Sequence, residues 1–207
     1  INLGNDAIDV SGSDIRIKNV IGISNSSDDL TKLLGIEVTD YNYKDVSHNA
    51  GEHKKLIAQN VLEVLPNAIQ MGENFIPDIY QTAKSVTKDE TTYIITIDDV
   101  KDLIVGDSVK LRYDGFGEFD IIITDVDSSV NSISFNLTDN IPTDLTQCDS
   151  VFVFGKKIND YLSVDYDHVM CLNISATQEL HKQLAEKDAT IKTLEDRLAA
   201  IEAHLGL

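Results

Sequence analysis

The sequence contains no tryptophan, only three prolines and only two cysteines in 207 residues. Basic residues are also scarce, because 17 lysines and arginines stand against 35 acidic residues and the formal net charge is −18. A surface this acidic repels phosphate backbones and anionic lipid headgroups, so we expect no nucleic acid and no membrane as a partner. No run of about 18 apolar residues occurs, so the sequence predicts no bilayer-spanning helix.

Motifs for metal binding or redox chemistry are lacking as well. Two cysteines as sparse as Cys148 and Cys171 favour reduced, partly buried thiols over a disulfide. His48 and His53 form the closest histidine pair, but their spacing fits no helical metal motif, and no cysteine or carboxylate pattern completes it. We therefore expect no metal and no cofactor.

The hydrophobic content of 42% is sufficient for a buried core. Residues 1–12, rich in Gly, Asn and Asp, alternate weakly between apolar and polar and are typical of the end of a β-structured stem. The first residue is Ile1 and not Met, so we expect the chain to be a piece of a longer protein whose upstream part forms that stem.

Residues 13–85 are predicted to form a compact core of short helices and strands. Ser27 can cap a short helix that ends at Gly35, with acidic residues in its first turn. The runs "IEVTDYNYK" and "KKLIAQ" are typical of strands, and "NVLEVLPNAI" indicates a helical turn that ends at Pro66. The pattern predicts an α+β fold for this core.

Residues 86–155 are predicted to form a small antiparallel β domain, similar to a barrel, inserted into the core. The β-rich runs "TTYIITI", "DSVKLRYD", "FDIIITDVD", "NSISFNLTD" and "SVFVFGKK" are separated by Gly, Asp and Asn. Aromatic side chains in such a domain belong to its core more often than to a binding surface, although a glycan-binding or receptor-binding site is an alternative. These aromatic residues are Tyr93, Tyr113, Phe116, Phe119, Phe135, Phe152 and Phe154.

Residues 156–207 are predicted to return to the core and to continue as a long helix, which Ser163 or Asp165 can cap. From residue 180 onward, apolar residues recur at the spacings of a heptad, with Lys187 at one d position. This narrow stripe is flanked by charge, which favours a coiled coil over a helix packed on its own domain. Leucine at a, with both leucine and isoleucine at d, favours an assembly larger than a dimer. The apolar positions are Leu180, Leu184, Ile191, Leu194, Leu198, Ile201 and Leu205.

The most reactive combination in the sequence is Ser13, which directly follows Gly12, with Lys18 five residues further on. A serine hydroxyl is a weak nucleophile until a base takes its proton, and lysine can do so only in its neutral form. The Ser13 hydroxyl could attack the Gly12 carbonyl and cut that peptide bond through an ester. Five residues place the two side chains on opposite faces of a strand, so they can meet only across a bend or between two subunits.

Four segments, in this order, resemble one known family. "SDIRIKN", "YNYKD", "HKKLIAQNVLEVLPNAI" and "SVDYDHVMCLNISATQEL" are similar to the C-terminal intramolecular chaperone domain of endosialidases, tail spikes and tail fibres. The resemblance covers residues 13–69 and 163–207, is specific as a set, and does not extend to the β region.

The resemblance implies a self-cleaving Ser/Lys peptidase that forms a homotrimer and assists the folding of its upstream fibre stem. Ser13 matches the nucleophile and Lys18 its partner, and the cut falls between Gly12 and Ser13. Asp14 and Arg16 match signature positions to which we assign a structural role. The family also implies assembly in the host cytoplasm and an upstream fibre that ends on the virion.

Two other functions are compatible with the same residues. The chain could be a permanent trimerisation tip in which the Ser13 and Lys18 pair is inert. It could also be a tip whose β domain binds a receptor or a glycan. A cut product on a denaturing gel distinguishes the first of these from a self-cleaving chaperone.

Overall fold

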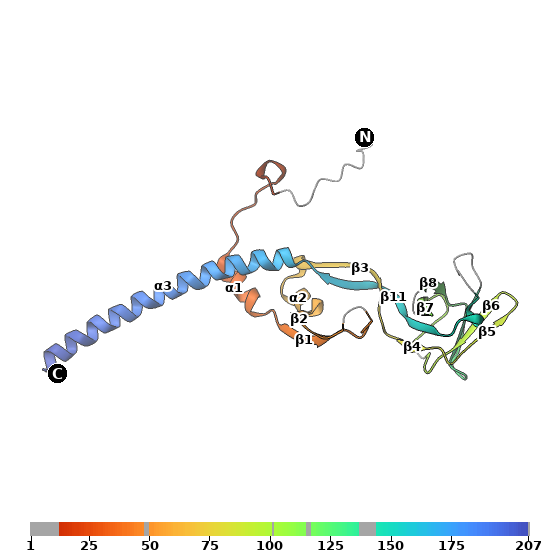
Figure 1. Cartoon of the computed structure of the whole chain (residues 1–207). Helices are drawn as coiled ribbons and strands as arrows, with labels where there is room; N and C mark the ends of the chain where they lie inside the picture. The colour runs from red at the N-terminus through yellow and green to blue at the C-terminus, as the bar shows by residue number, and fades with distance from the viewer. Residues whose placement is uncertain (1–12, 48–49, 101, 115–116, 137–143, 207) are drawn as a thin grey trace. The chain divides into compact units, whose positions relative to one another are not determined.

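The structure is a computed structural model that describes residues 13–47, 50–100, 102–114, 117–136 and 144–206 (Figure 1). Its two compact units are Ile1–Gly35 with Asp167–Leu207, and Ile36–Tyr166. Helices and antiparallel sheets both occur, which confirms the predicted α+β class. Neither unit coincides with one of the four predicted domains, whose boundaries remain a prediction. The predicted stem, residues 1–12, lies outside the described residues.

The first unit contains a single turn of 3-10 helix, η1 (Ile15–Ile17), the helix α1 (Ser26–Leu34) and most of the helix α3 (Tyr166–Leu205). The predicted short helix is confirmed as α1, and it ends at Gly35 as expected. Its cap was wrongly assigned, because the side chain of Asn25 accepts the backbone N–H of Ser27 at 3.2 Å. Ser27 is the second helical residue and therefore supplies the capped donor.

The helices α1 and α3 are joined by side-chain contacts. Leu30 of α1 is buried, as are Leu172 and Ala176 of α3. The Ser26 hydroxyl donates to Glu179 Oε2 at 2.9 Å, so a buried carboxylate on α3 is satisfied from α1. Hydrogen bonds from Gln183 and Ser26 lower the pKa of Glu179.

A second buried carboxylate, Asp29, lies on α1 itself. Hydrogen bonds with Ser175 and with Ser24 lower the pKa of Asp29, and the Ser24 hydroxyl lies 2.5 Å from its Oδ2. Because Ser175 belongs to α3, this bond also joins the two helices. The contact between α1 and α3 therefore includes two ionised carboxylates that receive hydrogen bonds.

These pKa shifts predict how acid affects the contact. Each folded-state pKa lies below its unfolded value of about 4, so the ionised forms stabilise the folded state above that pH. The contribution is lost as the pH falls through the lower, folded-state pKa. We expect the urea midpoint to fall more between about pH 5 and about pH 3 in the wild type than in Glu179→Gln, which cannot titrate there. Equal falls in the two proteins would contradict the assignment.

The second unit begins with an antiparallel hairpin of β1 (Val38–Asn42) and β2 (Glu52–Leu56). The helix α2 (Ala58–Val64) follows and confirms the predicted helical turn before Pro66. The predicted strand "KKLIAQ" was too long at its C-terminal end. Ile57 ends the extended backbone, and the next residue already belongs to the helix. A single 3-10 turn (Pro66–Ala68) leads from α2 into the sheets.

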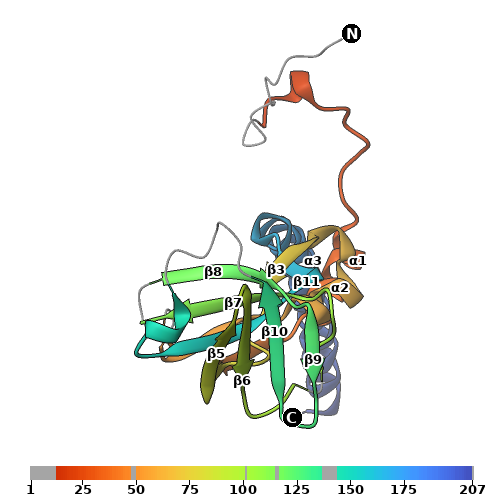
Figure 2. The same cartoon turned by 90° about the vertical axis from the view of Figure 1, so that its right-hand side faces the viewer.

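Two sheets make up the β region (Figure 2). One has the order β5-β6-β10-β9, and the other has β3-β11-β7-β8 with β4 also paired to β11. All pairings within them are antiparallel, as predicted for this region. The strands are β3 (Ile69–Phe75), β4 (Gln81–Thr82), β5 (Ser85–Asp89), β6 (Thr92–Thr96), β7 (Ser108–Tyr113), β8 (Gly117–Ile122), β9 (Asp125–Asp127), β10 (Ser132–Asn136) and β11 (Val151–Val164).

Inward-facing side chains of both sheets form one core, centred on Tyr93, Ile95, Leu111 and Phe135. Tyr93 and Phe135 are fully buried and stacked, with ring centroids 5.5 Å apart. Of the described aromatic residues named above, Tyr93, Phe119, Phe135 and Phe154 are buried, and Tyr113 and Phe152 are half-buried. This burial favours core packing over a binding surface. Phe116 lies outside the described residues.

The long strand β11 belongs to both the β core and the connection to α3. Its first half pairs with β7 and its second half with β3, and the register shifts between Val153 and Gly155. At Gly155 the backbone of the segment after β3 passes very close, so an added Cβ would collide with the Ile76 carbonyl oxygen and lie 2.6 Å from Asp78 Oδ1. Only glycine fits this crossing without movement of the backbone.

We therefore expect Gly155→Ala to destabilise the protein by about 1–3 kcal/mol, the usual cost of overpacking. The free energy of unfolding in urea measures this. Gly72→Ala is the matched control, because Gly72 lies in β3, which pairs with β11, and nothing approaches its Cβ position within 4 Å. If both variants unfold at the same urea concentration, the close approach at Gly155 is not a constraint on the fold.

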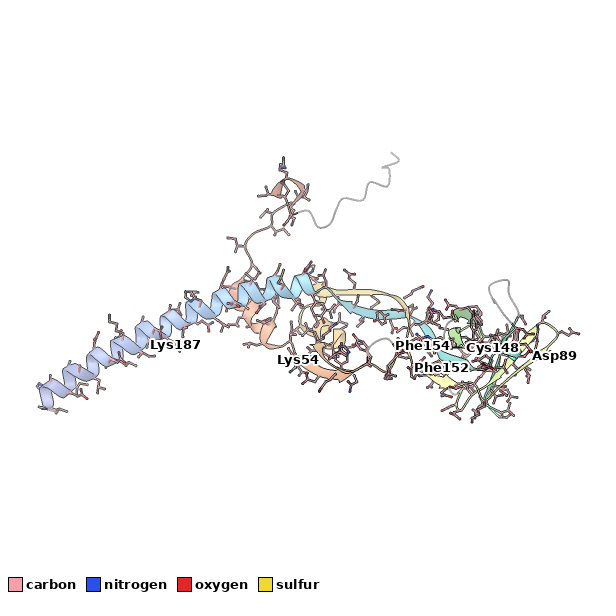
Figure 3. The ribbon with its side chains drawn as sticks, viewed as in Figure 1. Lys54, Asp89, Cys148, Phe152, Phe154 and Lys187 are labelled. Atoms are coloured by element: carbon pink, nitrogen blue, oxygen red, sulfur yellow. The ribbon has the colours of Figure 1, made fainter. Side chains whose placement is uncertain are left out.

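The helix α3 begins directly after Asp165, so this residue and not Ser163 occupies the cap position, because β11 continues to Val164. The seven apolar residues of the predicted heptad stripe, called the α3 seam below, are each between 49 and 65% exposed. These side chains therefore do not pack on the chain's own residues, as an ordinary amphipathic helix would require. Lys187 lies among them on the same helix (Figure 3). The coiled coil itself remains a prediction.

Cys148 and Cys171 form no disulfide with each other. Cys148 is half-buried as predicted, but Cys171 is exposed, so the prediction that both are partly buried was wrong for Cys171. In the part of the chain that the structure describes, no helix combines the length and the apolar character that a membrane crossing requires.

Candidate functional site

The candidate site is built on one short turn at the start of the described chain. Asp14 caps η1, because its Oδ1 accepts the backbone N–H of Arg16 at 2.8 Å. The backbone N–H groups of Ile17 and Lys18 then donate to the carbonyls of Asp14 and Ile15, both at 3.1 Å. The extended backbone therefore turns sharply between Ser13 and Lys18.

This turn brings the two predicted site residues together within one chain. Lys18 Nζ lies 3.0 Å from Ser13 Oγ, a distance at which a proton can pass between nitrogen and oxygen in either direction. A regular strand would hold the two side chains apart, so the bend is what makes the approach possible. Both residues are exposed. The Gly12 side of the predicted cut lies outside the described residues.

Asp14 and Arg16 form a fork beside the pair. Arg16 Nη2 lies 2.6 Å from Asp14 Oδ2, and its Nε lies 3.0 and 3.1 Å from the two carboxylate oxygens. The Arg16 side chain holds the pKa of Asp14 below its usual range, and Asp14 raises the pKa of Arg16. Each charge is thus neutralised locally, and the fork contributes little net field at Ser13.

The turn and the segment after it carry apolar side chains with nothing to cover them. Ile15, Ile17, Val20, Ile21 and Ile23 are each more than half exposed. Five aliphatic side chains in nine residues are unusual for a solvated segment, because each one left in water forgoes the free energy of burial. The candidate site thus lies in a segment that is suited to contact with another surface.

A second polar cluster, in Ile36–Tyr166, was missed by the sequence analysis. Arg112 of β7 pairs with Asp45 at 3.1 Å and lies over the ring of Phe154, 4.3 Å from its centroid. The Tyr80 hydroxyl also donates to Asp45, at 3.1 Å. Burial raises the pKa of Asp45, but hydrogen bonds from Ser47 and Arg112 outweigh it and leave this pKa far below its usual value.

This cluster fastens the loop after β1 to the β sheets. The sequence signals the local turn, since Asp45 and Ser47 have the spacing of an Asx turn, and the Ser47 N–H donates to Asp45 at 3.1 Å. It gives no sign of a partner 67 residues away. The cluster contains no activated nucleophile, and we assign it a structural role.

Three rings, Tyr41, Tyr43 and His53, form a third cluster at the β1–β2 hairpin. The Tyr41 hydroxyl donates to that of Tyr43 at 3.2 Å, which together with burial raises the pKa of Tyr41 to about 12. Nε2 of His53 is buried and has no hydrogen-bond partner among the described residues. His48, its predicted neighbour, lies outside them. Among the described residues, no group of three or more His, Cys, Asp or Glu side chains could hold a metal ion.

One curated viral protein is similar to this chain. The chain is 26% identical to the uncharacterized protein VP1 of Micromonas pusilla reovirus (isolate Netherlands/2005) over 94% of its own length. It spans only 12% of the length of that relative. The chain therefore corresponds to one segment of a much larger protein.

Comparison with family models gives a match over residues 13–70, and the matching family is described as the chaperone of endosialidase, peptidase S74. The matched segment contains Ser13, the turn, the β1–β2 hairpin and α2. It begins at Ser13, the residue that the sequence predicts as the nucleophile. The predicted resemblance is thus confirmed for residues 13–70, which match the endosialidase chaperone family, and the resemblance over residues 163–207 stays a prediction.

Proposed function

We propose that this chain is an intramolecular chaperone that forms a homotrimer, assists the folding of an upstream fibre stem and then releases itself by cutting between Gly12 and Ser13. The family match supports the chaperone role. The observation that carries the cleavage is the approach of Lys18 Nζ to within 3.0 Å of Ser13 Oγ, at the start of the matched segment. No cofactor takes part in this proposal.

The proposed reaction needs only groups of the chain and one water molecule. The neutral amine of Lys18 takes the proton of the Ser13 hydroxyl, and Oγ attacks the Gly12 carbonyl carbon. The carbon–nitrogen bond breaks, and the nitrogen leaves as the amine of Ser13 after accepting the proton from Lys18. This forms an ester between Gly12 and the Ser13 side chain. Water hydrolyses the ester, leaving a carboxylate on Gly12 and restoring the Ser13 hydroxyl.

Assembly would make this reaction possible. A solvated lysine is protonated at neutral pH, whereas loss of water and nearby cations favour the neutral form. Three chains joined along α3 would bring three copies of the turn together and cover its aliphatic side chains. The exposure of both the α3 seam and the residues from Ile15 to Ile23 supports this step, because each needs a partner surface.

The biological setting follows from the proposed role. A trimer nucleus that holds three chains in register lowers the entropic cost of starting a long intertwined stem. Cleavage afterwards would leave the stem protected by a high barrier to unfolding. We place the assembly in the host cytoplasm and the finished fibre on the virion, and the viral relative supports this setting.

We expect Ser13→Ala to abolish the cut and Lys18→Arg to slow it by about 100-fold or more, because arginine stays charged at any working pH. Mass spectrometry of the purified chain, with its upstream residues present, measures the loss of residues 1–12. Ser11→Ala is the matched control, since Ser11 flanks Gly12 on the other side and should cut normally. Continued cutting in Ser13→Ala would exclude Ser13 as the nucleophile. A wild-type chain that never cuts would favour the non-cleaving trimerisation tip.

We expect cleavage to require assembly through α3. The double variant Ile191→Glu/Leu198→Glu should be soluble, monomeric by analytical ultracentrifugation and uncut. Lys192→Glu/Ala199→Glu is the matched control, because these neighbours lie off the seam and should leave trimer and cut intact. An unrelated trimeric coiled coil that replaces the chain after residue 180, and with it the two substituted positions, should restore the cut. A monomeric chain that cuts at the normal rate would show that assembly does not control the chemistry.

A further inference from the structure

The contacts between Lys18 and Ser13 depend on a turn that makes almost no other contacts. All residues from Ser13 to Lys18 are exposed, and η1 contributes nothing to the buried core. A single 3-10 turn has too few hydrogen bonds to be stable by itself in water. Something local must therefore hold this turn in its bent form.

The fork of Asp14 and Arg16 is suited to that task. Asp14 Oδ1 accepts both the backbone N–H of Arg16, at 2.8 Å, and the Arg16 side-chain Nε, at 3.0 Å. One carboxylate thus caps the turn and also fixes the side chain that leaves its middle. A bidentate pair between carboxylate and guanidinium resists rotation more than a single contact does. The fork thus ties Asp14, the cap residue, to Arg16, the middle residue of η1.

We infer that Asp14 and Arg16 are positioning residues, which hold the turn so that Lys18 Nζ stays within reach of Ser13 Oγ. This inference rests on the proposed function and adds a specific role for the two signature residues. Neither residue touches the bond to be cut, and both act only through the position of Lys18. The fork should therefore affect the rate of cleavage without affecting folding.

The first test compares cleavage rates in the complete chain with its upstream residues. Asp14→Ala removes both the cap and the fork, and it should slow the cut by at least about 10-fold, within the range that positioned acid–base groups contribute. Asp14→Asn keeps an acceptor for the Arg16 N–H and should lie between Asp14→Ala and the wild type. Arg16→Lys keeps the charge but not the planar fork, so it should also cut slowly.

A matched control is available on the β1–β2 hairpin. Asp40 and Lys54 form an exposed pair at 3.3 Å on the β1–β2 hairpin, far from the turn in the sequence. Asp40→Ala should cut at the wild-type rate. All variants should unfold at the wild-type urea concentration and remain trimeric. If Asp14→Ala and Arg16→Lys cut as fast as Asp40→Ala, the fork does not position the pair.

A second test does not depend on cleavage. Ser13→Cys, in a background with Cys148→Ser and Cys171→Ser, places a thiol beside Lys18. Its alkylation by iodoacetamide at a series of pH values gives the titration midpoint of the thiol, read from the peptide in which the bond to Gly12 is intact. A neighbouring ammonium group should lower this midpoint by about one pH unit relative to the same protein with Lys18→Met.

The direction in which Asp14→Ala shifts the titration midpoint of the thiol distinguishes a positioning role from a purely electrostatic one. Removing a carboxylate would by itself lower the midpoint of a nearby thiol. Loss of the turn instead moves Lys18 away and raises the midpoint toward the value with Lys18→Met. We expect the rise, and we expect Arg16→Lys to show it too, although that variant conserves charge. A fall or an unchanged midpoint in Asp14→Ala would overturn the inference, whether or not the wild-type chain cuts itself.

Discussion

The apolar side chains that one copy leaves in water are the main constraint on this molecule. The α3 seam and the aliphatic residues beside the turn are exposed in a single chain, although burial of each would be worth on the order of 1.5–3 kcal/mol. The β core, by contrast, is complete, with Tyr93, Ile95 and Phe135 fully buried. The chain thus combines a part whose apolar side chains are buried within one copy with a part whose apolar side chains are exposed in one copy, as the proposed assembly would require.

Much of the architecture could be predicted from the sequence, because it depends on local patterns. Alternation identified β6, β7 and β10, and the heptad spacing identified α3. Errors arose where the local pattern was ambiguous or weak. Asn25 replaced Ser27 as a cap by a shift of two residues. The strands β3, β4 and β5 were missed because their residues are mostly exposed and show no clear apolar period.

In the candidate site and the polar clusters, contacts between residues close in the sequence were easier to predict than contacts between distant residues. Ser13 and Lys18 could be identified from residue types and the family resemblance, but their approach depends on a 3-10 turn that periodicity cannot reveal. The cap by Asp14 could have been predicted from the sequence, because an aspartate that accepts the backbone N–H two residues further on is a local motif. The pair of Arg112 and Asp45 was not, because 67 residues separate them.

The locality of the turn has a consequence for the order of events during synthesis. Its contacts join residues within a stretch of six, so their separation in the sequence is small and the turn can form within about a microsecond. The β sheets join residues far apart in the sequence, such as Phe75 and Lys157, and close much later. The side chains of Ser13 and Lys18 can thus meet long before the rest of the chain has folded. Under the proposed function, the delay before cleavage would therefore come from slow, concentration-dependent encounters between chains.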